Sequence, residues 1–320
     1  MIAYPPKDSD SAATDVRDPP IDNVVYDVAF GLDARFAPHT AAVIASICRC
    51  APGAQLRFLI LHSGVQEARR QAIERMAPGA RFVWTEVTTD DVPAYTERAR
   101  TKHVNRATLF RLGLEKLVPA DVSRVLYLDS DLIVLRDVRE LWSTDLGGSP
   151  IAAVTDHDVD APTFRKRWGL PENALGYFNA GVLFIDLNRV RAERLFTAAL
   201  DFVEQKEPGL GDQDALNWAL WGRWHPLPMR WNLQRDVVYA AVSPTAPPEL
   251  RRGVQDPIIV HYTGAHKPWL PEAYHPWAWL YWDNLSRTPF LKEVARDHGV
   301  SRSRRLRLWL RWLLRPAQRV

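Results

Sequence analysis

The chain alternates apolar runs typical of buried strands with segments typical of helices, and this alternation constrains the fold more than any other feature. The strand-like runs are 24–30, 55–62, 80–87 and 125–128. The helical segments that separate them are 37–50, 65–77 and 105–118. This order predicts an α/β fold with a mainly parallel central sheet. Further strands are expected at 150–156 and 180–187, followed by one long helix that begins at Asn188.

Charge is distributed unevenly along the chain. The net charge is +3, but residues 301–320 carry seven arginines and no acid. Residues 1–22 carry a net charge of −3, which leaves −1 for residues 23–300. The basic end therefore gives no reason to expect that the body binds nucleic acid. Residues 1–22 are rich in Pro, Asp and Ser and are predicted to be disordered.

The two cysteines and the N-terminal residues indicate the cellular compartment in which the protein is expected. Cys48 and Cys50 lie one residue apart in a helical pattern, where their side chains diverge, so we expect two reduced core residues. The first residues show no basic segment followed by an apolar one, as a secretory signal would. No run reaches the roughly 20 apolar residues of a membrane-spanning helix. The expected location is the cytoplasm.

Acidic side chains follow several of the predicted strands. Asp129 and Asp131 flank one serine after the fourth strand, Asp33 follows the first, and Asp156 follows the strand at 150–156. Ligands of open α/β sheets bind at the carboxyl ends of strands. The sequence contains neither the glycine-rich dinucleotide fingerprint nor a P-loop, so carboxylates that hold a divalent cation against phosphate oxygens are another way to bind a nucleotide. The alternative is a solvated turn, since Asp-x-Asp alone is common.

Three later segments offer further polar groups. They are 177–187, with Asn179-Ala180-Gly181; 209–220, with Asp212 and Gln213 at a helix start; and 258–269, with His261 and Lys267. Each also has an ordinary structural interpretation. These are a turn, acids that suit a helix N-terminus, and a structural histidine.

The motifs LYLDSD, FNAGVLFI, GDQDALN and HYTGAHKPW together resemble glycosyltransferase family 8 in order and spacing, over about residues 24–270. The resemblance is closest to the bacterial lipopolysaccharide galactosyl- and glucosyltransferases of that family. It implies a GT-A fold, a UDP-galactose or UDP-glucose donor, and Mn²⁺, with Mg²⁺ as the alternative. It also implies transfer to a glycan or glycolipid acceptor with retention of configuration.

The resemblance assigns roles to individual residues. The implied metal ligands are Asp129, Asp131 and His261, and the imidazole favours Mn²⁺ over Mg²⁺. The implied donor-binding residues are Asp33, Phe36, His103, Arg111, Asp156, Asn179, Ala180, Gly264 and Lys267. The implied catalytic residues are Asp212, Gln213 and Lys267.

Three positions affect what the resemblance implies for binding and mechanism. Arg35 stands where the family commonly has asparagine, and Phe36 stands where it often has a tyrosine that stacks on the base. Gln213 lies where a nucleophile has been sought in the family. Because an amide oxygen is a poor nucleophile, we expect Gln213 to stabilise an oxocarbenium-like transition state. Substitution on the face that the diphosphate leaves is therefore favoured over a covalent intermediate.

Residues 271–320 form a predicted aromatic and basic helical region outside a catalytic domain at 23–270. One face of its helix carries Leu306, Trp309, Leu310 and Leu313. The other carries Arg304, Arg307, Arg311 and Arg315, with Leu308 and Trp312 off the apolar centre. This pattern predicts attachment to an anionic membrane surface, here the inner face of the cell membrane. A helix packed on the body and an RNA-binding arm are the alternatives.

The function predicted from these features is a retaining, metal-dependent hexosyltransferase in cell-surface polysaccharide synthesis. A non-catalytic module that binds a sugar nucleotide or glycan on the same fold is the alternative, since fold does not fix function. The acids, the histidine and the lysine favour the enzyme.

Overall fold

The computed structural model describes residues 24–88, 91–92, 106–172, 175–206, 210–243, 245–248, 251, 254–272 and 275–314. The segment 1–22, His103 and Arg315, all named above, lie outside the described residues. Among the described residues, no helix combines the length and the apolar character that crossing a bilayer requires.

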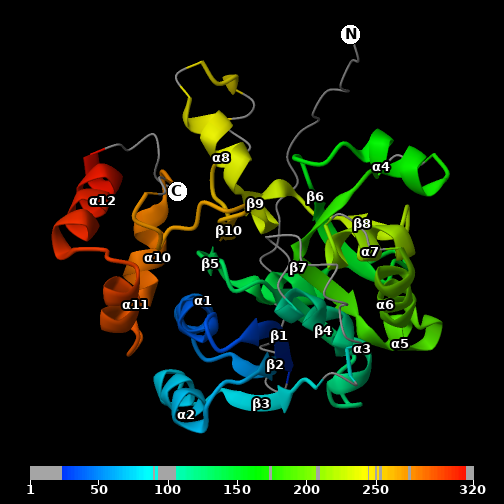
Figure 1. Cartoon of the computed structure of the whole chain (residues 1–320), viewed down its shortest axis with the longest axis horizontal. Coiled ribbons are helices and arrows are strands. Elements are labelled where there is room, and N and C mark those ends of the chain that lie inside the picture. The colour runs from blue at the N-terminus through cyan, green and yellow to red at the C-terminus, as the bar shows by residue number, and fades with distance from the viewer. Residues whose placement is uncertain are drawn as a thin grey trace, which may run out of the picture.

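A seven-stranded sheet forms the centre of the protein (Figure 1). Its order is β3-β2-β1-β4-β7-β6-β8. The strands are β1 (Val25–Asp33), β2 (Gln55–Ser63), β3 (Arg81–Glu86), β4 (Arg124–Leu128), β6 (Ile151–Thr155), β7 (Phe178–Asp186) and β8 (Trp224–Pro226). β7 runs antiparallel to β4 and β6, and the other pairings are parallel. The predicted α/β fold with a mainly parallel sheet is confirmed.

Helices cover both faces of this sheet. They are α1 (Ala37–Cys50), α2 (Glu67–Met76), α3 (Leu114–Leu117), α4 (Ala161–Trp168), α5 (Leu187–Glu193), α6 (Leu195–Lys206), α7 (Asp212–Ala219), α8 (Arg235–Val242), α10 (Ala278–Leu285), α11 (Leu291–Asp297) and α12 (Arg302–Leu314). The 3₁₀ helices are η2 (Arg106–Gly113), η3 (Val138–Ser143) and η4 (Met229–Trp231). Phe30 and Leu128 face the core that contains α1 and α10, whereas Ala29 and Tyr127 face the core of η2, α6 and α7. Adjacent residues thus serve opposite cores, as the pleat of a strand requires.

A second, three-stranded sheet lies beside the first. It contains β5 (Leu132–Val134), β10 (Ile259–His261) and β9 (Leu233–Gln234), in the order β5-β10-β9. β10 is antiparallel to β5, so that His261 pairs with Leu132, and parallel to β9, so that His261 also pairs with Gln234. This small sheet places His261 beside the residues that follow β4.

Two helix predictions were wrong in detail. The segment predicted as one helix at 105–118 is a 3₁₀ helix, η2, that continues as the short α3. A 3₁₀ helix aligns side chains three residues apart, which turns both Thr108 and Arg111 toward one cleft. The helix expected from Asn188 is two helices, because Arg194 adopts a left-handed φ of 53° between them. The Glu115 carboxylate then accepts hydrogen bonds from the amides of Phe196 and Thr197, at 2.8 and 3.0 Å, and so caps α6.

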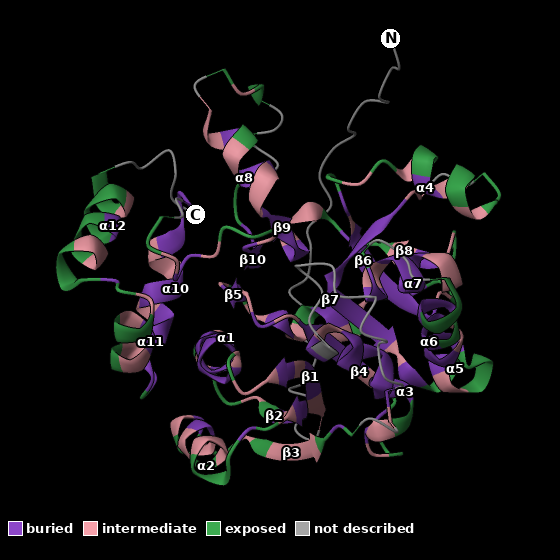
Figure 2. Ribbon diagram, in the orientation of Figure 1, coloured by how far each residue is buried: buried purple, intermediate pink, exposed green. Residues whose placement is uncertain are grey.

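Of the C-terminal helices, α10 packs on α1 and α12 packs on α10 (Figure 1). Leu308 of α12 is 9% exposed, and the Trp312 ring packs edge-on against Trp277 with centroids 6.4 Å apart. The opposite side of α12 is exposed (Figure 2). The side that contacts the body is therefore the one with Leu308 and Trp312, and the predicted apolar face points to solvent. The proposed domain boundary at residue 270 stays a prediction.

Candidate functional site

Polar side chains meet at the carboxyl ends of β1, β4 and β6. The parallel pairing of β1 with β4 places Asp33 and Asp129 at the same edge of the sheet. β7 runs in the opposite direction, so its first residues, Asn179 and Ala180, lie at this edge too. Asp156 directly follows β6. The topology therefore brings strand ends that are far apart in sequence to one place.

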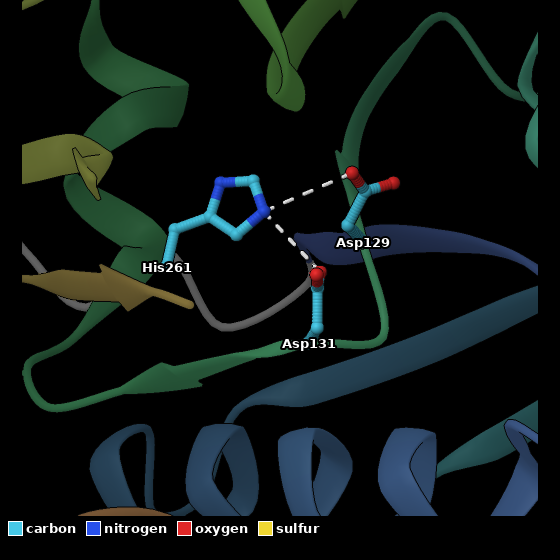
Figure 3. A group of neighbouring side chains, drawn as sticks. All are labelled: Asp129, Asp131 and His261. Carbon is cyan, nitrogen blue, oxygen red and sulfur yellow. Dashed lines mark ion pairs between the residues drawn. The ribbon is translucent and has the colours of Figure 1, made fainter. Parts of the chain in front are cut away.

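Asp129, Asp131 and His261 form a compact cluster of potential metal ligands (Figure 3). One ligand atom from each residue lies within 4.8 Å of the others. His261 Nε2 lies 3.2 Å from Asp131 Oδ1 and 3.9 Å from Asp129 Oδ2. Two carboxylates and one imidazole suit Mn²⁺ better than Mg²⁺. The donor set and its spacing fit a divalent cation.

Neighbouring groups orient the ligands of this cluster. His261 Nδ1 lies 2.9 Å from Asn232 Oδ1, which leaves Nε2 directed toward the two acids. The Tyr127 hydroxyl donates to Asp129 Oδ1 at 2.8 Å. Gly181 leaves room for the His261 ring and the Asp129 carboxylate to approach each other. A Cβ at this position would lie 2.2 Å from His261 Cε1 and 2.8 Å from Asp129 Oδ2.

Arg111 connects the metal cluster to the start of α7. Its guanidinium lies 3.0 Å from Asp129 Oδ1 and 2.6 Å from Asp212 Oδ2, and it donates to the Ala180 carbonyl. Burial would lower the pKa of Arg111, but Asp129 and Asp212 outweigh burial and raise it. Burial raises the pKa of Asp212, an effect that Arg111 opposes and Asp129 reinforces. Arg111 is thus a permanent cation at the floor of the site.

Lys267 supplies a second cation on the opposite side of the cluster. Its ammonium group donates to Asp131 Oδ2, and to the Tyr262 carbonyl at 2.8 Å. Burial alone would raise the pKa of Asp131. The Lys267 and His261 side chains outweigh burial and hold that pKa well below its usual range. Asp131 is therefore a carboxylate at neutral pH.

A third group of polar residues is connected by hydrogen bonds. Asp156 Oδ2 accepts from Asn179 Nδ2 at 2.9 Å and from Gln213 Nε2 at 3.1 Å. Gln213 Oε1 in turn accepts from the Ala180 amide at 3.0 Å. The network continues to the metal cluster through Asn232, whose Nδ2 donates to Asn179 Oδ1 at 2.9 Å. Both ends of the Gln213 amide are thus held in place.

A cleft of about 810 Å³ opens beside Asp129, Asp131, Arg111 and Lys267, whereas His261, Asp156, Asn179, Ala180, Asp212 and Gln213 are not part of its lining. Its lining includes Arg35, Phe36, Thr108, Arg111, Asp129, Asp131, Gly264 and Lys267. Asp33 lies beside it, and its carboxylate accepts from the Arg35 amide and guanidinium at 2.8 Å. Phe36 lines the wall of the cleft. The Arg35 guanidinium is paired with the Asp33 carboxylate.

Sequence reasoning missed three residues that shape this site. Asn232 and Tyr127 act through hydrogen bonds to His261 and Asp129. Asn232 belongs to a segment without a motif, and Tyr127 lies within LYLDSD but was interpreted only as part of a strand. Gly181 was expected at the start of the strand at 180–187, with a turn as the alternative, but its close contact with His261 was not foreseen. It lies inside β7, which begins two residues earlier than predicted. The Asn-Ala-Gly sequence at the start of an apolar run was the only available signal for the close approach of His261.

Known proteins share this architecture. The model of a family described as glycosyl transferase family 8 matches residues 27–273. General stress protein A of Bacillus subtilis (strain 168) is 25% identical over 267 residues, which cover 80% of this chain and 91% of that protein. Lipopolysaccharide 1,2-glucosyltransferase of Escherichia coli (strain K12) is 28% identical over 274 residues, or 84% of this chain and 80% of that protein. The crystal structure of galactosyltransferase LgtC with donor and acceptor sugar analogs has a TM-score of 0.72 and 27% identity, and the match covers 85% of this chain and 99% of that chain.

These matches define the class of protein. The fold is of the GT-A type, and the chain is an enzyme of the hexosyltransferase class, as the sequence predicted. It belongs to glycosyl transferase family 8, whose model covers more than half of its length.

Proposed function

We propose that this enzyme transfers galactose or glucose from a UDP-sugar to a glycan or glycolipid, with retention of configuration and with Mn²⁺ as cofactor. The cluster of Asp129, Asp131 and His261, whose two acids line the cleft, is the observation that carries the proposal. Its relatives include a lipopolysaccharide glucosyltransferase and a galactosyltransferase, which supports a hexose donor and a role in cell-surface polysaccharide synthesis.

The residues divide into four sets of binding roles. A divalent cation held by Asp129, Asp131 and His261 would neutralise charge on the donor diphosphate. Lys267 and Gly264, at the same side of the cleft, would contact the diphosphate, and the lysine would stabilise the charge of the departing UDP. Asp33 and Phe36 would bind the uracil base. Arg111, Asp156, Asn179 and Ala180 would hold the sugar, and His103 is proposed for the donor on sequence alone.

Neither Gln213 nor Asp212 is well placed to act as the nucleophile of a covalent intermediate. The Gln213 oxygen already accepts a hydrogen bond from Ala180, and Asp212 is paired with Arg111. We therefore assign Asp212 and Gln213 to stabilisation of positive charge at the anomeric carbon. The acceptor oxygen then bonds to that carbon on the face from which the phosphate oxygen departs. The proton of the acceptor hydroxyl passes to the departing diphosphate.

A donor panel tests the proposal. Purified protein incubated with Mn²⁺ and single UDP-sugars should hydrolyse UDP-galactose or UDP-glucose slowly without acceptor. Excess chelator and Asp131→Asn should each abolish turnover, and added Mn²⁺ should restore the chelated enzyme. Full activity in excess chelator would remove the metal from the mechanism. A glycosyl adduct on Gln213 or Asp212 in mass spectra would instead establish a covalent intermediate.

The same experiment separates the enzyme from a non-catalytic binding module. A module would bind UDP-sugar, detectable by calorimetry, yet release no hexose from any donor at any Mn²⁺ concentration. The acids and the histidine of the cluster, together with Lys267, favour the enzyme, because a bound cation and the lysine would stabilise the charge of the leaving diphosphate.

We further propose that α12 attaches the enzyme to the cytoplasmic face of an anionic membrane. Among the described residues six large apolar side chains are exposed, and five of them belong to α12: Leu306, Trp309, Leu310, Leu313 and Leu314. Each arginine near an anionic surface contributes on the order of 1 kcal/mol.

Two changes to α12 test the attachment. The double variant Leu310→Ser and Leu313→Ser, and truncation after residue 300, should both reduce sedimentation with anionic vesicles. Hydrolysis of the soluble donor should stay unchanged, because the proposed site residues precede residue 270. Equal sedimentation of the wild type and both variants at low and high salt would refute the attachment.

A further inference from the structure

A cleft separate from the one over the metal cluster lies between α10 and α12. It has a volume of about 260 Å³, several times the roughly 30 Å³ that one water molecule occupies in the liquid. Aromatic rings and two arginines dominate its walls, which are formed by Trp279, Trp282, Ser286, Arg302, Arg305, Leu306 and Trp309. None of these residues belongs to the proposed catalytic machinery.

Within the described ranges, the arginines of this cleft have no acidic partner. Arg305 lies over the Trp282 ring, 5.7 Å from its centroid, and its Nε is buried without a hydrogen-bond partner in the described part of the chain. Neither Arg302 nor Arg305 forms an ion pair with any residue in the described ranges. Asp283 of α10 pairs instead with Arg287, at 3.5 Å. Buried donors without an acceptor are rare in proteins, so an anion that enters the cleft would supply the missing partner.

The cleft opens beside the exposed apolar face of α12. Leu306 and Trp309, at its rim, are 53% and 37% exposed. Helical spacing places Arg305 between the side of α12 that packs on the body and this apolar face. A ligand that used both features would have a phosphate at one end and apolar chains at the other.

We propose that the α10–α12 cleft binds the phosphate of an anionic glycerophospholipid. Arg302 and Arg305 would donate to the phosphate oxygens, which the fork of a guanidinium matches in a bidentate manner. The acyl chains would lie along Leu306 and Trp309. The site rests on the proposed attachment of α12 to the membrane, and it adds recognition of a headgroup to general attraction between charges.

A pair of charge-conserving variants separates recognition from general attraction. Arg305→Lys keeps the positive charge and the cation over Trp282 but removes the fork. Arg307→Lys makes the same change on the other side of α12, outside the cleft. Binding of each full-length protein to phosphatidylcholine vesicles with and without phosphatidylglycerol would be measured by sedimentation. Arg305→Lys should bind the anionic vesicles about tenfold more weakly than the wild type, and Arg307→Lys should match the wild type.

The outcomes are distinguishable from one another. Equal binding of all three proteins to the anionic vesicles would overturn the headgroup site while the attachment of α12 stands. No binding of the wild type would overturn both, and donor hydrolysis would still report on the transferase. Binding of glycerol 3-phosphate without vesicles, lost in Arg305→Lys, would make the cleft a site for free phosphate esters and overturn the lipid assignment. Unchanged thermal midpoints would show that the variants keep α12 docked.

Discussion

Replacement of Gly181 by alanine should disable the metal cluster without disturbing the sheet. The new Cβ would lie 2.2 Å from His261 Cε1 and 2.9 Å from His261 Nδ1. Ordinary contacts between carbon atoms are about 3.5 Å or longer, so the imidazole would have to move by roughly 1.3 Å. Misplacement of a reacting group by 1 Å can cost about 10²-fold in rate, which corresponds to about 2.7 kcal/mol. We therefore expect turnover to fall by about two orders of magnitude.

Two measurements make this expectation testable. Donor hydrolysis gives kcat, and titration of free Mn²⁺ by electron paramagnetic resonance gives the affinity of the site independently of turnover. Gly113→Ala is the matched control, because its Cβ would be too close only to the flexible end of Leu117, at 2.9 Å, and would lie at an ordinary 3.6 Å from Leu61 Cδ1. Its φ of −71° also suits alanine. If Gly181→Ala keeps the fold and also keeps the Mn²⁺ affinity and turnover of the wild type, the claim that His261 needs a glycine at this position is refuted.

Three further predictions concern the partner of His261, the Lys267 cation, and Asp158, whose amide donates to Asp156 Oδ1 at 2.9 Å. Asn232→Ala removes the partner of His261 Nδ1 and should weaken Mn²⁺ binding or activity by about 10- to 100-fold. An unchanged affinity for Mn²⁺ would count against the role of Asn232 in orienting His261. Lys267→Ala should lower kcat by about 10²-fold with a smaller effect on KM, and an effect on KM alone would show that the lysine contributes only ground-state binding. Burial and the neighbouring Asp236 raise the pKa of Asp158 to about 6. The bound proton therefore stabilises the fold at low pH, and this stability is lost as pH rises through about 6, so Asp158→Asn should raise the thermal midpoint more at pH 7.5 than at pH 5. An equal effect at both pH values would contradict the raised pKa.

The sequence predicted where most strands of the central sheet lie along the chain, because each is an apolar run bounded by polar residues. It also predicted which residues end those strands, and the structure brings Asp129, Asp131 and His261 together. Helix boundaries were less predictable where tertiary contacts decide them. The break at Arg194 depends on Glu115, a residue about 80 positions earlier that caps α6. No local pattern could report such a contact.

The orienting residues and the direction of α12 were also beyond local patterns. Asn232 carries no motif, and its role depends on the pairing of β9 with β10. Leu308 and Trp312 were expected off the apolar centre of α12, yet they are the side chains that pack on the body. Amphipathic periodicity identifies an apolar face but not the neighbour that covers it. That neighbour is determined by where α10 lies, which the sequence of α12 does not encode.

The pairing of β5 with β10 has a consequence for how the enzyme matures. Asp131 and Lys267 are 136 residues apart in the chain, and they meet only after β10 has joined the strand that follows Asp131. During synthesis the first four strands of the central sheet emerge long before His261 does. Contacts of such long range are slow to form, because loop closure costs entropy before any contact compensates for it. The site should therefore be among the last parts to assemble, and a chain interrupted before residue 259 should be wholly inactive rather than partly active.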